Sequence, residues 1–207
     1  MLLSLVAFVG AAVLIVLLPG PDTLVVVRSI LRGGRRQGIL TALGNLCGLT
    51  VWVVAAALGL AAMVEASEVG YTALRLVGAC YLVMLGIQAW RSRGRVEQPA
   101  APRRGVLRRG GLGTGFRAGV LTNLLNPKVG VFFVTFLPGF VPDGASVLWT
   151  TVLYGAIFVA LTAAYWVVLL GLAGTVTTWM NTPVIRRRLD TATAAVLVAF
   201  GLRLGTE

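Results

Sequence analysis

Two short polar breaks interrupt apolar stretches of this 207-residue chain. The first is Pro-Gly-Pro-Asp at 19–22, and the second is Asn-Pro-Lys at 126–128. Proline cannot continue the backbone hydrogen bonding of a helix, and a charged side chain at membrane depth costs roughly 2.5 to 3.5 kcal/mol on insertion scales. Two such breaks at matching places predict a duplicated structure with a polar site at its centre.

The composition predicts an all-α integral membrane protein. Hydrophobic residues make up 57% of the chain and charged residues 12%, and the mean hydropathy is +0.90. Basic residues outnumber acidic ones by 18 to 7, but the arginines gather between apolar segments rather than on an amphipathic face, so no nucleic-acid partner is expected. Cys47 and Cys80 lie far apart in apolar segments, which favours packing roles over a thiol relay.

About six segments are long enough to cross a bilayer, which needs about 20 helical residues. They lie near 2–27, 39–62, 72–90, 118–137, 147–171 and 189–204. Arginines cluster after the first, third and fifth segments, whereas the other connections carry acidic residues. Because basic loops stay in the cytoplasm, both termini are expected on the outside.

The arginine-rich stretch at 91–117 predicts a cytoplasmic linker between two units, 1–90 and 118–207. Each unit would hold three spans, and an odd number places the second unit upside down relative to the first. The pattern Val-Leu-x-x-Leu-Leu at 13–18 recurs at 120–125, just before each break. We therefore expect two inverted three-helix repeats, with broken first and fourth helices.

The break residues have recognisable local chemistry. Asn126 is a strong N-cap type and Pro127 suits the first helical position, so a new half-helix is expected there. Asp22 and Lys128 would lie at membrane depth, where charges normally face a cavity. The simpler alternatives are a packing kink at the prolines and a structural ion pair between the two charges.

The predicted substrate-binding site collects the residues of both breaks and three further polar side chains. Asn45 and Asn123 could instead form interhelical hydrogen bonds, and Gly44-x-x-x-Gly48 permits close helix approach within one subunit or in a homodimer. No metal site and no cofactor is predicted. The full set is Pro19, Gly20, Pro21, Asp22, Asn45, Tyr81, Asn123, Asn126, Pro127 and Lys128.

Three motifs resemble the lysine-exporter (LysE/RhtB) family of bacterial amino-acid exporters. They are Pro-Gly-Pro at 19–21, Gly-Ala-x-Tyr-Leu-x-x-x-Gly at 78–86 and Leu-Asn-Pro-Lys at 125–128, in this order along nearly the whole chain. The resemblance implies a multi-pass carrier of the bacterial inner membrane that expels amino acids or small derivatives, driven by the proton gradient. The substrate class and the direction of transport rest on the resemblance alone.

The charges at the breaks suggest how such a substrate would bind. Half-helix N-termini with Lys128 would attract a carboxylate, and Asp22 would receive an ammonium. Asp22 is also the candidate for proton coupling, because burial favours its neutral form and Lys128 nearby favours its charged form. A metal-ion or other small-solute exporter and a passive channel are the alternatives.

The arginine distribution generates a topological prediction. In a background lacking Cys47 and Cys80, single cysteines near Glu68 and near Arg104 should react with an impermeant thiol reagent from opposite sides of the membrane. Labelling of both positions from the same side would contradict the six-span arrangement and the inverted repeat.

Overall fold

The computed structural model describes residues 2–18, 20–66, 68–92, 112–142 and 144–172, and some residues between 188 and 202. Pro19 and most of the predicted linker lie outside the described residues. All secondary structure in the described part is helical. The elements are α1 (Leu2–Leu17), α2 (Pro21–Ala66), α3 (Glu68–Ser92), α4 (Leu112–Leu124), α5 (Pro127–Val131), the π-helix η1 (Phe132–Phe136), the 3-10 helix η2 (Leu137–Phe140) and α6 (Val147–Gly171).

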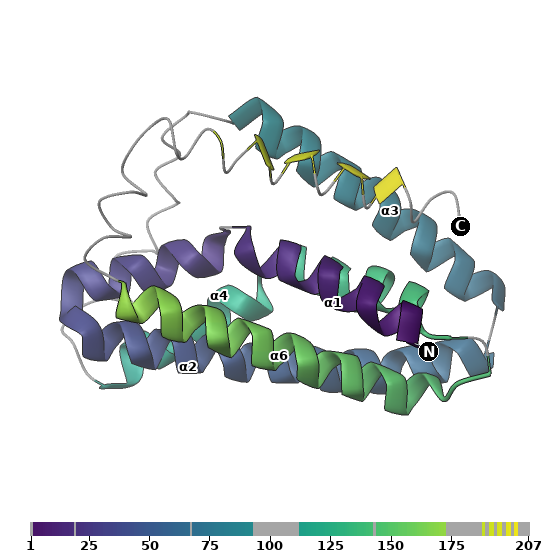
Figure 1. The fold of residues 1–207 in the computed structure, drawn as a ribbon, viewed down its shortest axis with the longest axis horizontal. Helices are drawn as coiled ribbons and strands as arrows, with labels where there is room; N and C mark the ends of the chain where they lie inside the picture. Colours follow the sequence, from purple (N-terminus) through teal and green to yellow (C-terminus); the bar gives the residue numbers. More distant parts are fainter. Residues whose placement is uncertain are drawn as a thin grey trace.

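Helix α2 reverses direction at Gly34 (Figure 1). Gly34 has φ 73 and ψ −176, in a left-handed region that favours glycine. The two arms pack against each other, with Val26 and Ala42 in one buried cluster. The expected arginine-rich loop between the first two spans is therefore replaced by a tight turn, and its arginines lie on the helical arms that flank Gly34.

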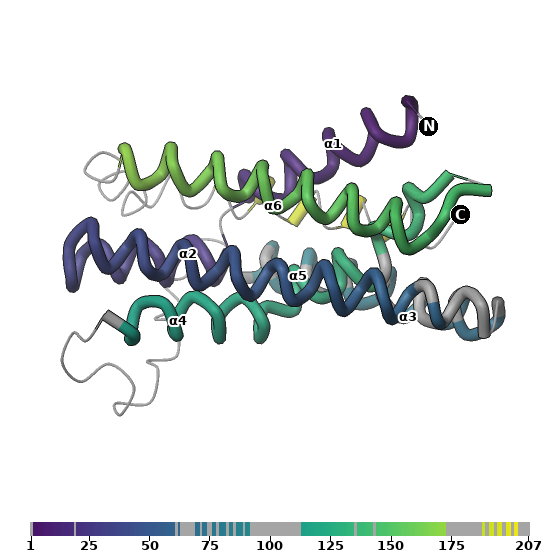
Figure 2. The backbone as a smooth tube through the Cα atoms, turned by 90° about the horizontal axis from the view of Figure 1, so that it is seen from below, coloured from purple at the N-terminus to yellow at the C-terminus, as the bar shows by residue number. Residues whose placement is uncertain are grey.

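The second arm of α2 packs closely against α4 through glycines (Figure 2). A Cβ atom added at Gly44 would collide with the carbonyl of Phe116, and one added at Gly119 would collide with the carbonyl of Thr41. The small residues let the two backbones touch, as in other membrane helix pairs. The Gly44-x-x-x-Gly48 pattern thus serves packing within the subunit, and it brings Asn123 beside Gly48.

Two buried hydrophobic clusters lie on either side of the breaks. The larger one joins α1, α2, η1 and α6 and is rich in aromatic rings, with Phe8 stacked on Tyr154 at a centroid distance of 4.5 Å. The smaller cluster joins both arms of α2 to α6 around Trp166. The polar break residues therefore lie between two apolar layers.

Within the part of the chain that the structure describes, two apolar helices are long enough to cross a bilayer, one within α2 and the other α6. The second arm of α2, residues 35–60, gives about 39 Å of helix, against a hydrocarbon core of about 30 Å. Large apolar side chains face outward along these helices, with Leu58 at 62% and Val167 at 72% exposed. Such a surface suits contact with lipid.

The glycine contacts generate a stability prediction. Gly119→Ala should lower the thermal midpoint of the purified protein in detergent by about 2 to 6 °C, because overpacking by one methyl group costs about 2 kcal/mol and exceeds the gain in helix propensity. Alanine favours helix by about 0.5 to 1 kcal/mol over glycine, so a loss of stability must come from the contact. Gly59→Ala is the matched control on α2, because nothing lies within 4 Å of its added Cβ. Equal melting of both variants would contradict the close approach.

Candidate functional site

The first break leaves backbone carbonyls at the end of α1, and the side chain of Lys128 binds them. Its Nζ donates to Ile15 O at 2.8 Å and to Leu18 O at 2.9 Å. A cation at the C-terminus of a helix also interacts favourably with the helix dipole. Lys128 therefore caps a helix of the other half of the chain.

The second break is held by two asparagines. Asn126 caps α5 as predicted, since its Oδ1 accepts from the backbone N–H of Lys128 at 3.1 Å. The Nδ2 atom of Asn126 donates to Asp22 Oδ2 at 2.8 Å, and that of Asn123 donates to the same oxygen at 3.2 Å. Asp22 stands in the first turn of α2, where the dipole favours a negative charge. The carboxylate of the first break is thus bound by the amides of the second.

The charged side chain of each break therefore binds polar groups on or next to the other break. Asp22 reaches across to Asn126, and Lys128 reaches back to Leu18. Each charge makes its hydrogen bonds with neutral polar groups of the opposite half. Charge-assisted hydrogen bonds are the stronger kind, and here they replace part of the hydration that burial removes.

Tryptophan side chains orient the other polar groups of this layer. Trp166 Nε1 donates to Asn45 Oδ1 at 3.2 Å, and Trp52 Nε1 donates to Asn123 O at 3.3 Å. The hydroxyls of Thr23 and Tyr165 lie 3.3 Å apart. Both tryptophan bonds join helices from different halves of the chain. The bond from Trp166 orients the Asn45 amide, whereas the bond from Trp52 holds the backbone at Asn123.

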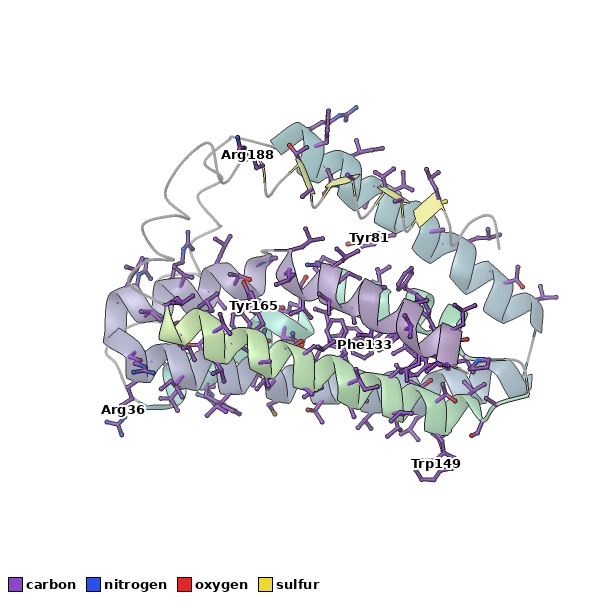
Figure 3. The ribbon with its side chains drawn as sticks, viewed as in Figure 1. Arg36, Tyr81, Phe133, Trp149, Tyr165 and Arg188 are labelled. Carbon is purple, nitrogen blue, oxygen red and sulfur yellow. The ribbon has the colours of Figure 1, made fainter. Side chains whose placement is uncertain are left out.

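A cavity of about 50 Å³ lies between the breaks. A volume of this kind holds roughly three to five water molecules. Helices α1, α2, α4, α5 and α6 all contribute to its wall. Figure 3 labels Tyr165, a residue of this wall, on α6. The polar side chains in the wall are Asp22, Thr23, Asn45, Asn123, Asn126, Lys128, Thr162, Tyr165 and Trp166.

The structure brings six of the predicted site residues to this cavity and leaves three described ones elsewhere. Pro21 and Pro127 are exposed residues that begin helices, and Tyr81 lies on α3 and is not in the cavity wall (Figure 3). Pro19 is outside the described residues. The six residues in the wall are Gly20, Asp22, Asn45, Asn123, Asn126 and Lys128.

The predicted site contained no residue of α6. Phe158, Thr162, Tyr165 and Trp166 line the cavity from this helix. Their spacing of three and four residues marks one helix face, and the polar atoms on that face of an apolar helix were a readable signal.

The wall of the cavity offers one carboxylate, one ammonium, several amides and hydroxyls, and apolar side chains. Such a wall can bind a small molecule that carries both charges.

Comparison with known proteins identifies the family. The LysE type translocator model matches residues 13–207. The chain is similar to the uncharacterized membrane protein YrhP of Bacillus subtilis, with 28% identity and 98% of each chain covered.

Two relatives are named as efflux proteins. The threonine efflux protein of Escherichia coli K12 is 29% identical, covering 90% of this chain and 89% of its own, and the homoserine/homoserine lactone efflux protein of Salmonella typhimurium is 24% identical, covering 97% and 95%. No solved structure matches. The chain belongs to the LysE type translocator family, as its motifs indicated, and it is a membrane transporter rather than an enzyme.

Proposed function

We propose that this protein exports amino acids or small amino-acid derivatives across the bacterial inner membrane, coupled to the proton gradient. The reciprocal binding of Asp22 and Lys128 around one cavity carries the proposal. Charged side chains at membrane depth normally mark a substrate or ion path. The names of the threonine and homoserine efflux relatives agree with an amino-acid substrate.

The proposed architecture is six membrane spans in two inverted repeats, 1–90 and 118–207, joined by a cytoplasmic linker, with both termini outside. The breaks would interrupt the first and fourth spans. Reciprocal contacts between α3 and the C-terminal segment support a twofold relation. An added Cβ at Gly86 would meet Val198 and Ala194, three and seven residues before Gly201.

The contacts of Gly201 with α3 repeat this pattern in the opposite direction. An added Cβ at Gly201 would meet Val83 and Ala79, three and seven residues before Gly86. Equal offsets in both directions are what a twofold axis between two segments produces. The axis would relate the two halves, and rocking of one against the other would open the cavity to each side in turn.

In the proposed site, the substrate binds between Asp22 and Lys128. Two of the three N–H donors of the Lys128 ammonium bind the carbonyls of Ile15 and Leu18, which leaves one for a carboxylate. Asp22 would couple transport to protons, because its neutral form loses the charge-assisted bonds from Asn123 and Asn126. A passive channel with the same cavity would need no such coupling.

Replacing the charges tests this assignment. Lys128→Met should reduce counterflow of a labelled amino acid in proteoliposomes by at least about tenfold, because removing one partner of a buried hydrogen-bonded charge costs about 2 to 5 kcal/mol. Asp22→Asn with Lys128→Met should remain inactive. A structural pair predicts instead that this double variant regains transport along with stability. Rates are normalised to folded protein measured by size-exclusion chromatography.

Proton coupling has its own signature. Asp22→Asn should keep substrate exchange between equal pools at saturating substrate, with weaker affinity, while losing uphill accumulation driven by an imposed pH gradient, since asparagine retains an acceptor oxygen for the substrate but cannot release a proton. The measurement compares both modes in one preparation of vesicles. Gradient-driven accumulation that survives in this variant would assign the coupling proton to another group.

A further inference from the structure

Four buried side-chain atoms among the described residues have no hydrogen-bond partner. They are Asp22 Oδ1, Asn45 Nδ2, Asn123 Oδ1 and Thr151 Oγ1. The first three belong to residues in the wall of the cavity, whereas Thr151 is not part of that wall. Buried polar groups are costly to leave unpaired, so three of them around one cavity indicate a bound group.

The existing hydrogen bonds fix which atoms face the cavity unpaired. Asn45 accepts from Trp166 Nε1 with its Oδ1, so its Nδ2 is the free end. Asn123 donates to Asp22 Oδ2 with its Nδ2, so its Oδ1 is the free end. Turning either amide over would set donor against donor or acceptor against acceptor. The cavity therefore presents two acceptors and one donor.

We propose that these three atoms form the subsite for the α-ammonium group of the exported amino acid and for one oxygen of its carboxylate. Asp22 Oδ1 and Asn123 Oδ1 accept from the ammonium, and Asn45 Nδ2 donates to the carboxylate beside the remaining N–H of Lys128. This assignment rests on the proposed function and names the partner of each end of the substrate. An ammonium has three donors and no acceptor, which matches a pair of acceptor oxygens.

Asn45 and Asp22 both line the cavity. Neither Asn45 Nδ2 nor Asp22 Oδ1 has a hydrogen-bond partner. A group that accepts from the amide and donates to the carboxylate would bridge them. A zwitterionic amino acid has both functions on adjacent atoms, and a water molecule is the competing occupant.

The charges of the wall restrict the substrate class. Asp22 and Lys128 are the charged residues among the described residues of the wall, so their formal charges cancel. A neutral zwitterion meets one partner for each of its charges. A dibasic amino acid would bring a second cation with no second carboxylate to receive it, which is unfavourable in a site away from water. Ile15, Leu49 and Thr162 complete a wall suited to a small apolar or hydroxylated side chain.

Analogues of one substrate test the subsite on the unaltered protein. Labelled threonine is the counterflow probe in proteoliposomes, and unlabelled competitors are threonine, lysine, 1-amino-2-propanol, which lacks the carboxylate, and 3-hydroxybutyrate, which lacks the ammonium. We expect lysine to compete at least about tenfold more weakly than threonine, and each of the two analogues to do the same, because each lacks one of the two charged groups that the subsite binds. Competition by lysine, by the amine or by 3-hydroxybutyrate that equals that of threonine would overturn the assignment.

Two variants test whether Asn123 takes part in threonine binding. Asn123→Leu should weaken threonine binding, measured as ligand-induced thermal stabilisation in detergent, by at least about tenfold. Thr151→Val removes an unpaired buried hydroxyl away from the cavity and should change binding by less than about twofold. Unchanged threonine binding in Asn123→Leu would mean that the free oxygens hold only water. Counterflow of no amino acid by the unaltered protein would instead overturn the proposed function, and this subsite with it.

Discussion

The exchange of charged side chains between the two breaks is the interaction on which the rest of the site depends. A break in a membrane helix exposes backbone groups that lipid cannot satisfy. Here the carbonyls of Ile15 and Leu18 receive the ammonium of Lys128, while Asp22 receives the amides of Asn123 and Asn126. Each break thus supplies what the other lacks. A change at one break leaves unpaired groups at both.

Close helix packing positions the residues that make these hydrogen bonds. The contact of Gly44 and Gly119 with opposing carbonyls brings α2 against α4, and Asn45 and Asn123 follow directly along these helices. Larger residues at the glycines would move the amides away from Asp22. The indole of Trp166 then holds the Asn45 side chain from α6. The polar layer is therefore positioned by apolar and backbone contacts above and below it.

The sequence predicts the polar layer well because its signals are local. A proline after an asparagine predicts the cap at Asn126, and a charge in an apolar stretch predicts a cavity. The partners of Lys128 could not be predicted, since they are backbone carbonyls that every residue carries. The polar face of α6 was readable from the spacing of its residues, but the sequence does not show which helix turns such a face toward the cavity. Both helices carry tyrosines, and tertiary packing alone decides that Tyr165 rather than Tyr81 reaches the cavity wall.

The turn at Gly34 was missed for a different reason. Four arginines close to two glycines read as a solvated loop, because charged residues dominate cytoplasmic connections. Arginine is also a good helix former, so the same residues can extend both arms to a single reversal. Gly34 supplies the positive φ that such a reversal requires. Composition cannot separate these two structures when the loop contains a glycine.

The contacts that close the cavity differ between its two sides. Toward the end of the molecule that carries Arg36, the hydroxyls of Thr23 and Tyr165 meet at 3.3 Å (Figure 3). On the other side, the aromatic cluster joins α1, η1, η2 and α6, with Phe132 only 4.8 Å from Phe158 between ring centroids. Its π-helix is a form often found at functional sites. In the proposed mechanism, opening toward the arginines separates this polar contact and the smaller cluster around Trp166, whereas opening the other way repacks the larger aromatic cluster.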